Sequence, residues 1–178
     1  KKNYEPLITE IISLATGAST WEYSTNSGSN FTSGSNTSFV LSQATYAANS
    51  IQVRNTDAAG NVSAVTQNGS EIVIDTTAPT AEISYSSAGP YKENAAVTIT
   101  ATFNEDMKSS PVPQINISGV DTVANTNMTR VSARVYTYAF TASTGNGTNT
   151  VRLATGTDLA GNAVTPTPTN GDTFDIDN

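Results

Sequence analysis

The chain has 178 residues, only 13% of them charged, and a net charge of −7. We expect no nucleic-acid binding and no direct membrane insertion, because an acidic surface repels phosphate groups and no Lys/Arg cluster is present to reach anionic lipid. The chain contains no Cys and no His, which excludes disulfides, thiolate zinc sites and catalytic arrangements that use either residue. We therefore expect no enzyme activity, and any bound metal should be a hard cation that prefers oxygen ligands.

Short runs of alternating apolar and polar residues mark strands in the first half of the chain. Trp21 and Tyr23 share one face of such a run, and Ile72 and Ile74 share a face of another. Clusters of Asn, Gly and Ser separate the runs, as is typical of turns. Trp21 and Tyr23 have two interpretations: core packing of a sandwich, which the burial preference of Trp favours, or a platform on which a sugar stacks.

A boundary is predicted where the strand pattern breaks after Ile74. The segment Asp75–Thr80 contains Pro79, which fixes its own φ and biases the residue before it toward an extended conformation. We expect a first domain over residues 1–75, a short stiff linker over 76–80 and a second domain over 81–178. The absence of an initial Met and of a signal peptide suggests a piece of a longer polypeptide.

The second half carries the clearer strand patterns. Apolar and polar residues alternate strictly over Val97–Phe103, and Tyr136, Tyr138 and Phe140 lie on one face of the run at residues 134–140. Many short strands punctuated by turns at regular intervals are typical of sandwiches. The fold class predicted for the chain is all-β, with two β-sandwich domains in tandem.

One internal repeat supports two homologous domains. The segment Thr56–Val62 (TDAAGNV) matches Thr157–Ala163 (TDLAGNA), and each copy is followed by an apolar strand with acidic residues, ending at Asp75 in the first case and Asp177 in the second.

Several segments together resemble the bacterial Ig-like repeats of large surface adhesins, many of which are exported by type I secretion and carry RTX repeats. The resemblance covers residues from about 20 to 178 in outline, and residues 1–19 match less clearly. The segments that carry it are Trp21–Gly28, Tyr46–Arg54, Thr56–Ser63, Asp75–Thr80, Val97–Glu105 and Gly156–Asn162.

The resemblance implies two immunoglobulin-like domains arranged end to end in an extracellular stalk on the bacterial cell surface. Its partners would be neighbouring repeats of the same chain, and we expect a monomer. In many such repeats calcium at the joints makes the string rigid. Two alternatives stay open: a carbohydrate- or protein-binding module near the adhesin tip, and an accessory Ig-like domain of a secreted hydrolase.

The order of strands in an Ig-like sandwich allows a calcium site to be predicted. The loop after the second strand and the loop between the last two strands lie at the pole where the first strand starts, which is also where the linker arrives. Three carboxylates and their neighbours should therefore converge at the joint and supply oxygen ligands: Asp75, Asn104, Glu105, Asp106, Asp158 and Asn162.

Two weaker outer half-sites follow from the same argument. Asp57 and Asn61 would lie at the far pole of the first domain, and Asp175 and Asp177 at the end of the second. A simpler interpretation of each Asp-Xaa-Ala-Gly-Asn motif is a tight turn without metal, in which Asp accepts backbone N–H groups and Gly supplies a positive φ. Both interpretations of the motif stay open.

Overall fold

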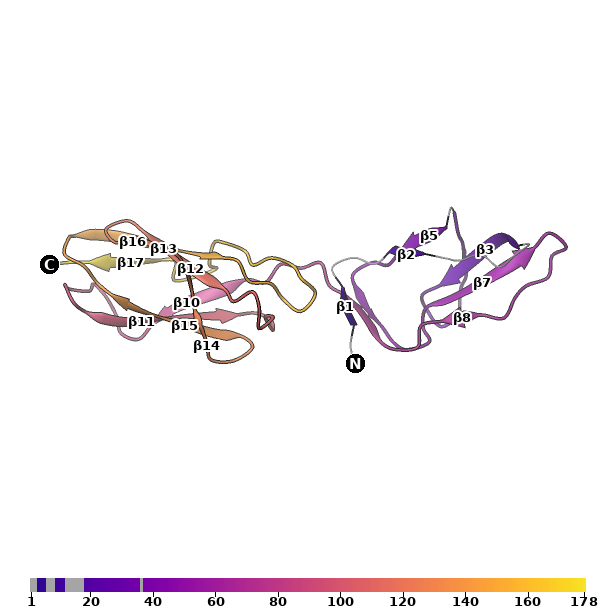
Figure 1. Cartoon of the computed structure of the whole chain (residues 1–178), viewed down its shortest axis with the longest axis horizontal. Helices are drawn as coiled ribbons and strands as arrows, with labels where there is room; N and C mark the ends of the chain where they lie inside the picture. The colour runs from indigo at the N-terminus through magenta and orange to yellow at the C-terminus, as the bar shows by residue number, and fades with distance from the viewer. Residues whose placement is uncertain (1–2, 6–8, 12–17, 36) are drawn as a thin grey trace. The chain divides into compact units, whose positions relative to one another are not determined.

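We describe the fold from a computed structural model, which describes residues 3–5, 9–11, 18–35 and 37–178 (Figure 1). The chain is all-β and divides into two compact units, Lys1–Thr76 and Thr77–Asn178. The predicted fold class, two tandem β-sandwich domains, is confirmed. Within the described residues, no helix is long and apolar enough to cross a membrane.

The first unit is built on a sheet in the order β4-β3-β7-β8 and on smaller groups of strands. The smaller groups are β1-β9-β6, in which β1 runs parallel to β9, and the pair β2-β5. The bounds of the strands are β1 Asn3–Glu5, β2 Thr9–Ile11, β3 Ala18–Ser24, β4 Thr32–Ser33, β5 Ser38–Val40, β6 Ala44–Tyr46, β7 Gln52–Asp57, β8 Thr66–Gln67 and β9 Ile72–Ile74.

Apolar side chains from several strands fill the core of the first unit. Trp21 of β3, Phe39 of β5 and Ile74 of β9 are all buried there, and Tyr23 packs against them. Tyr23 stacks on Phe39 with ring centroids 4.2 Å apart. Trp21 is 3% exposed, which confirms the core interpretation of this residue.

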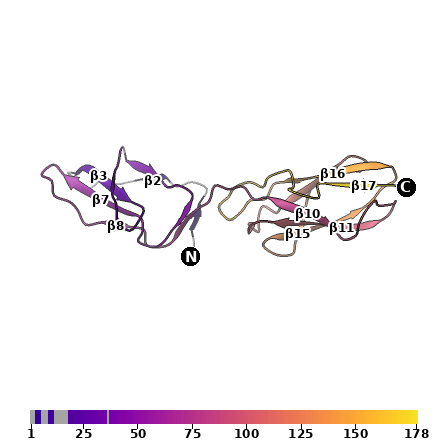
Figure 2. The same ribbon diagram turned by 180° about the vertical axis from the view of Figure 1, so that it is seen from behind.

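The second unit is a sandwich of two four-stranded sheets, visible as two layers in Figures 1 and 2. One sheet has the order β10-β11-β15-β14 and the other β13-β12-β16-β17. The bounds of the strands are β10 Ala81–Tyr85, β11 Ala96–Phe103, β12 Gln114–Ser118, β13 Val123–Asn127, β14 Thr129–Arg130, β15 Val135–Thr141, β16 Gly147–Ala154 and β17 Thr173–Ile176.

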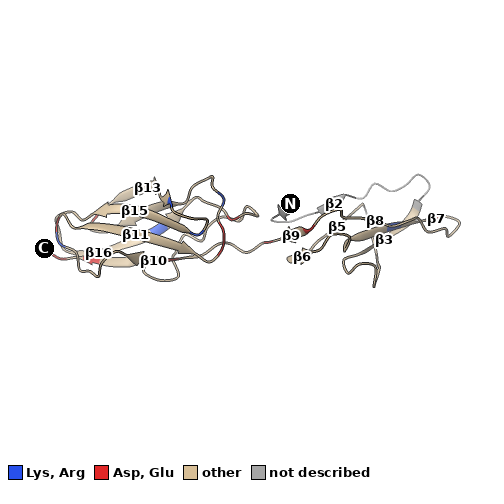
Figure 3. Cartoon of the chain, turned by 90° about the horizontal axis from the view of Figure 1, so that it is seen from below, with Lys and Arg blue, Asp and Glu red and all other residues tan. Residues whose placement is uncertain are grey.

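The predicted alternation produces the core of this sandwich. On β11, Val97, Ile99, Ala101 and Phe103 are buried, whereas Thr98 and Thr102 face water. On β15, the antiparallel neighbour of β11 in the same sheet, Tyr136 and Phe140 are buried as their spacing predicts, and Tyr138 packs partly against the core. Charged residues are scarce on these strands, so most of the ribbon in Figure 3 is neither acidic nor basic.

Candidate functional site

The turn at Asp158–Asn162 follows β16 and is held by the Asp158 carboxylate. Its Oδ1 accepts hydrogen bonds from the backbone N–H groups of Gly161 at 2.6 Å and Asn162 at 2.9 Å, and its Oδ2 accepts one from Asn162 Nδ2 at 2.7 Å. Gly161 has a φ of 107°, a conformation that favours glycine. The Asp158 residue is only 1% exposed, so these bonds satisfy a carboxylate that is shielded from water.

The repeated motif forms the same turn in the first unit. Asp57 Oδ1 accepts from the N–H groups of Ala59 at 2.9 Å and Asn61 at 2.8 Å, and Oδ2 accepts from Asn61 Nδ2 at 2.8 Å. Backbone pairing also matches, since Thr56 bridges to Val62 as Thr157 bridges to Ala163. The hydrogen bond from the Asn61 amide, followed by that from the Asn61 N–H, lowers the pKa of Asp57 from its usual value. Turn chemistry is therefore present in both copies of the motif.

The loop that follows β11 carries Glu105 and is fixed at both ends. Asn104 Oδ1 accepts a hydrogen bond from the Thr80 N–H at 2.8 Å, and the Asn104 N–H donates to the Thr80 carbonyl at 3.0 Å. Asp106 accepts a hydrogen bond from Arg134 Nε at 2.6 Å. The Asn104 side chain thus caps the backbone at Thr80, and one Asp106 oxygen is held by a cation of the protein itself.

Arg134 is a residue that the sequence analysis missed. Besides its ion pair with Asp106, its guanidinium donates to the Asn104 carbonyl at 3.2 Å, so one side chain holds both flanks of Glu105. Arg134 lies about 30 residues from this loop along the chain, and no local pattern connects the two segments.

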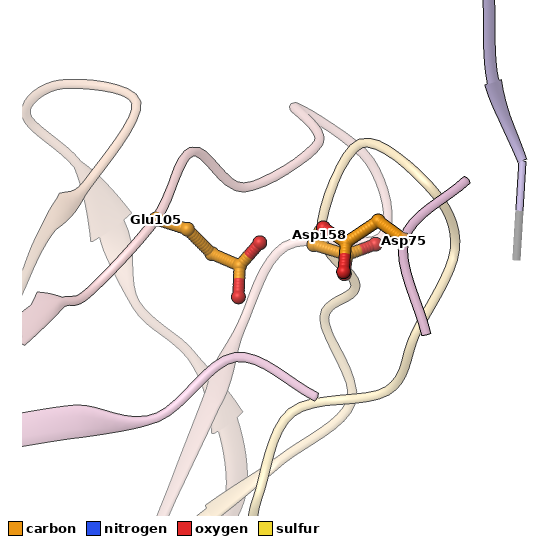
Figure 4. Close-up of side chains that lie close together, drawn as sticks. All are labelled: Asp75, Glu105 and Asp158. Carbon is orange, nitrogen blue, oxygen red and sulfur yellow. The ribbon is translucent and has the colours of Figure 1, made fainter. Parts of the chain in front are cut away.

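Figure 4 shows the three acidic residues at the centre of the predicted calcium site, which we call the acidic group: Asp75, Glu105 and Asp158. Glu105 and Asp158, both in the second unit, each offer a carboxylate oxygen, and these two oxygens lie within 4.8 Å of each other. Glu105 and Asp158 are fixed in the second unit by the two loops described above. Asp75 directly follows β9, which ends at Ile74.

The covalent chain limits how far Asp75 can move from Asn104. Five peptide links join Asp75 to Thr80, whose backbone is hydrogen-bonded to Asn104, so even a fully extended segment spans only about 17 Å. The linker therefore holds the Asp75 carboxylate in the neighbourhood of Glu105 at a high local concentration.

The geometry allows Asp158 only a limited part in binding a cation. A carboxylate has about four lone-pair positions, and its own turn occupies three on Asp158. Asp158 would thus give one oxygen, whereas Glu105 and Asp75, both partly buried, would supply others. The oxygen chemistry of the group fits Ca²⁺.

The residues predicted for the outer half-sites form no such acidic group within the described part of the chain. Asp175 Oδ1 accepts a hydrogen bond from Thr148 Oγ1 at 2.6 Å on the neighbouring strand. Asp177 is exposed, and its N–H donates to the Tyr91 carbonyl at 2.9 Å. Asp57 and Asn61 bond to each other, as described above.

Comparison with known proteins gives one structural likeness. No family model matches the chain, and no curated protein matches it in sequence. Fibronectin(III)-like modules of CbhA from Clostridium thermocellum align with 99% of this chain and 87% of their own, at 16% identity and a TM-score of 0.40. The sandwich assignment made above rests on the sheets and cores of this chain.

A shallow hollow in the first unit lies beside Trp21. It has a volume of about 370 Å³ and is lined by Ser19, Thr20, Trp21, Glu22, Ser33, Gly34 and Thr56. The Gly34 backbone lies against the indole, because a Cβ at this position would fall 2.0 Å from Trp21 Cε2. The ring face is therefore covered by protein, which leaves the stacking surface that a sugar would require occupied.

A second missed feature is a buried polar pair at the other end of the second unit. Asn149 Nδ2 donates to Asp121 Oδ2 at 2.7 Å, and Asn149 Oδ1 accepts from the Asp121 N–H at 2.8 Å. Asn149 is 0% exposed and Asp121 is 7% exposed. The other carboxylate oxygen of Asp121, Oδ1, accepts a hydrogen bond from the Ser143 N–H. The pair satisfies its own polar atoms and fastens the loop after β12 to β16.

Proposed function

We propose that this chain is a structural spacer, a stalk segment of a long bacterial cell-surface adhesin, in which Ca²⁺ stiffens the connection between two Ig-like units. The observation that carries the proposal is the pair of neighbouring carboxylates at Glu105 and Asp158 of the second unit. The short covalent segment that follows β9 ties the third acidic residue, Asp75, to this pair. The lack of His and Cys and the separate core in each unit also favour a mechanical role over a catalytic one.

The electrostatics of the group favour a divalent cation. The neighbouring carboxylates of Glu105 and Asp158 repel each other, and the burial of Asp158 weakens the screening by water. Ca²⁺ takes six to eight oxygen ligands at about 2.3–2.6 Å and would turn this repulsion into attraction. Backbone carbonyls and water would complete the shell, with Asn104, Asp106 and Asn162 as nearby oxygen donors that already hold protein partners.

Stiffening would follow from closing a short loop with a metal. The end of this segment is anchored without a cation, because Thr80 is hydrogen-bonded to Asn104 and the Pro79 carbonyl accepts from the Thr165 N–H at 2.9 Å, so its backbone freedom lies before Pro79. A cation shared by Asp75 and the second unit would remove most of that freedom. The distance over which the stalk extends would then depend on the calcium concentration outside the cell.

The role of a stalk segment also implies where the protein acts, how it is exported and what it contacts. The protein would be extracellular, exported by type I secretion and monomeric, with neighbouring repeats as its partners. Asp57 with Asn61, and Asp175 with Asp177, would act as weaker half-sites that a neighbouring repeat completes.

Calcium titration of the whole chain tests the proposal. We expect thermal unfolding of the second unit to shift upward with Ca²⁺ and to return with chelator, because a ligand at about 100 times its Kd adds about 2.7 kcal/mol of stability. Glu105→Gln should abolish the shift. Glu82→Gln is the matched control, since Glu82 is an exposed carboxylate of β10 outside the group, and it should leave the shift intact. Equal melting curves with calcium and with chelator would refute the calcium part of the proposal.

A further inference from the structure

The chain contains three Asn-Gly bonds, at Asn68, Asn146 and Asn170. In this dipeptide the glycine nitrogen can attack the Asn side-chain carbonyl, because no Cβ on the following residue obstructs the approach. The reaction needs the nitrogen beside Asn Cγ and a side-chain amide free to leave. The three positions share this dipeptide and differ in the residues around it, so the folded structure is judged against the rates in the unfolded chain.

The Asn68 side chain is locked by three hydrogen bonds. Its Oδ1 accepts from the Ile51 N–H at 2.9 Å, and its Nδ2 donates to the carbonyls of Ala47 and Ser70, both at 2.8 Å. Rotation toward Gly69 would break all three bonds, and the leaving amide nitrogen is itself held twice. The fold therefore protects Asn68.

The Asn146 side chain is held by a residue distant in sequence. Its Oδ1 accepts a hydrogen bond from the Asn178 N–H at 2.6 Å. Gly147 is also the first residue of β16 and pairs with Ile176 of β17. The Asn146 side-chain carbonyl is thus bonded to another segment, and Gly147, whose nitrogen would attack it, is held in a sheet. The fold therefore also protects Asn146.

The Asn170 side chain, in contrast to the other two, is turned toward the glycine that follows it. The Gly171 N–H donates to Asn170 Oδ1 at 2.9 Å, which places the glycine nitrogen beside the carbon bonded to that oxygen. Asn170 is exposed, so water can reach the product of the first step. Gly171 has a φ of 70°, and a Cβ there would fall 2.1 Å from the Ile83 carbonyl oxygen, so the fold itself requires glycine at this position.

We propose that Asn170 is a site of spontaneous deamidation in the folded protein. The Gly171 nitrogen gives its proton to water and forms a bond to Asn170 Cγ, the Cγ–Nδ2 bond breaks, and Nδ2 takes up a proton from water and leaves as ammonia. Water then opens the cyclic imide at either carbonyl. Opening at Cγ gives Asp, and opening at the backbone carbonyl gives isoaspartate, with the chain running through Cγ.

The modification would loosen the edge of β10. The Ile83 N–H donates to the Asn170 carbonyl at 2.9 Å, and Tyr85 Oη donates to the Gly171 carbonyl at 2.7 Å. Isoaspartate routes the backbone through Cβ and Cγ, which adds one atom to residue 170 and turns the carbonyl that accepts from Ile83 into a side-chain carboxylate, so both bonds cannot keep their geometry. Either product also adds a negative charge next to Glu82, which bridges to Asn170.

Peptide mapping of the aged protein tests the proposal with internal controls. The whole chain is incubated folded at mildly alkaline pH, and a second sample is incubated in denaturant. Asp and isoaspartate are then quantified by mass spectrometry at all three Asn-Gly bonds. In the folded sample we expect product at Asn170 to accumulate several-fold faster than at Asn68 or Asn146, and in denaturant the three rates should converge.

A matched variant confirms the assignment of the product. Asn170→Gln keeps the amide but lengthens the side chain by one methylene, so it should suppress the modification at this position and leave the other two unchanged. The proposal is overturned if Asn68 or Asn146 reacts as fast as Asn170 in the folded chain. It is also overturned if Asn170 stays intact when folded, whether or not it reacts in denaturant.

Discussion

At the residue scale, the two copies of the turn differ in their surroundings more than in their bonds. Asp57 and Asp158 each accept two backbone N–H groups and one Asn amide. Asp57 does so at the surface, whereas Asp158 is buried. A hydrogen bond contributes more where water cannot replace it, so the same motif should have different energetic weight in the two units.

We expect Asp158→Ala to destabilise the second unit by about 2–4 kcal/mol, because it removes a buried carboxylate that accepts three hydrogen bonds. Asp57→Ala should destabilise the first unit less, since water can solvate the released N–H groups. Denaturant unfolding in the presence of chelator measures both effects without a contribution from calcium. Equal losses for the two variants would show that burial does not decide the energy of this turn.

The lowered pKa of Asp57 predicts a pH dependence of defined sign. A carboxyl whose pKa is lower in the folded than in the unfolded state stabilises the fold above its unfolded pKa, and this contribution is lost as the pH falls through the folded pKa. Carboxyl NMR titration should therefore give Asp57 a midpoint below that of an ordinary Asp. Asn61→Ala should raise this midpoint, because it removes the side-chain hydrogen bond that lowers the pKa most. An unchanged midpoint would contradict the assigned cause.

At the scale of elements, strand β11 shows why the alternating pattern predicts the fold well. Its inward residues form the core and its outward threonines contact solvent, so a register shift of one residue would exchange the two sets. Ile99→Ala should cost about 2–5 kcal/mol of the free energy of unfolding, because Ile99 is fully buried. Thr98→Ala on the same strand should change it by less than about 0.5 kcal/mol, since Thr98 is exposed. Similar losses at both positions, measured by denaturant unfolding, would contradict the observed register.

The elements also show which features the sequence could predict. Strand faces and the two repeated turns follow from local patterns, and the structure has them as expected. The Asp121–Asn149 pair and the contacts of Arg134 join segments far apart in sequence, and neither leaves a periodic signal. For the candidate site, the sequence predicted Asp75, Glu105 and Asp158 as a group, but it could not show that Asn104 already caps Thr80.

At the scale of the whole molecule, each unit carries its own hydrophobic core. One core contains Trp21, Phe39 and Ile74, and the other contains Ile99, Tyr136 and Phe174. Units with separate cores can move relative to each other unless the connection restrains them. In the proposed function, the connection from Asp75 to Thr80 is therefore the element that sets the properties of the stalk.

Small-angle X-ray scattering of the whole chain with calcium and with chelator distinguishes a stiffened connection from a free one. We expect a narrower distribution of interunit distances with calcium, and a return to the broad distribution in chelator or in the Glu105→Gln variant. Superimposable scattering profiles with calcium and with chelator would contradict it.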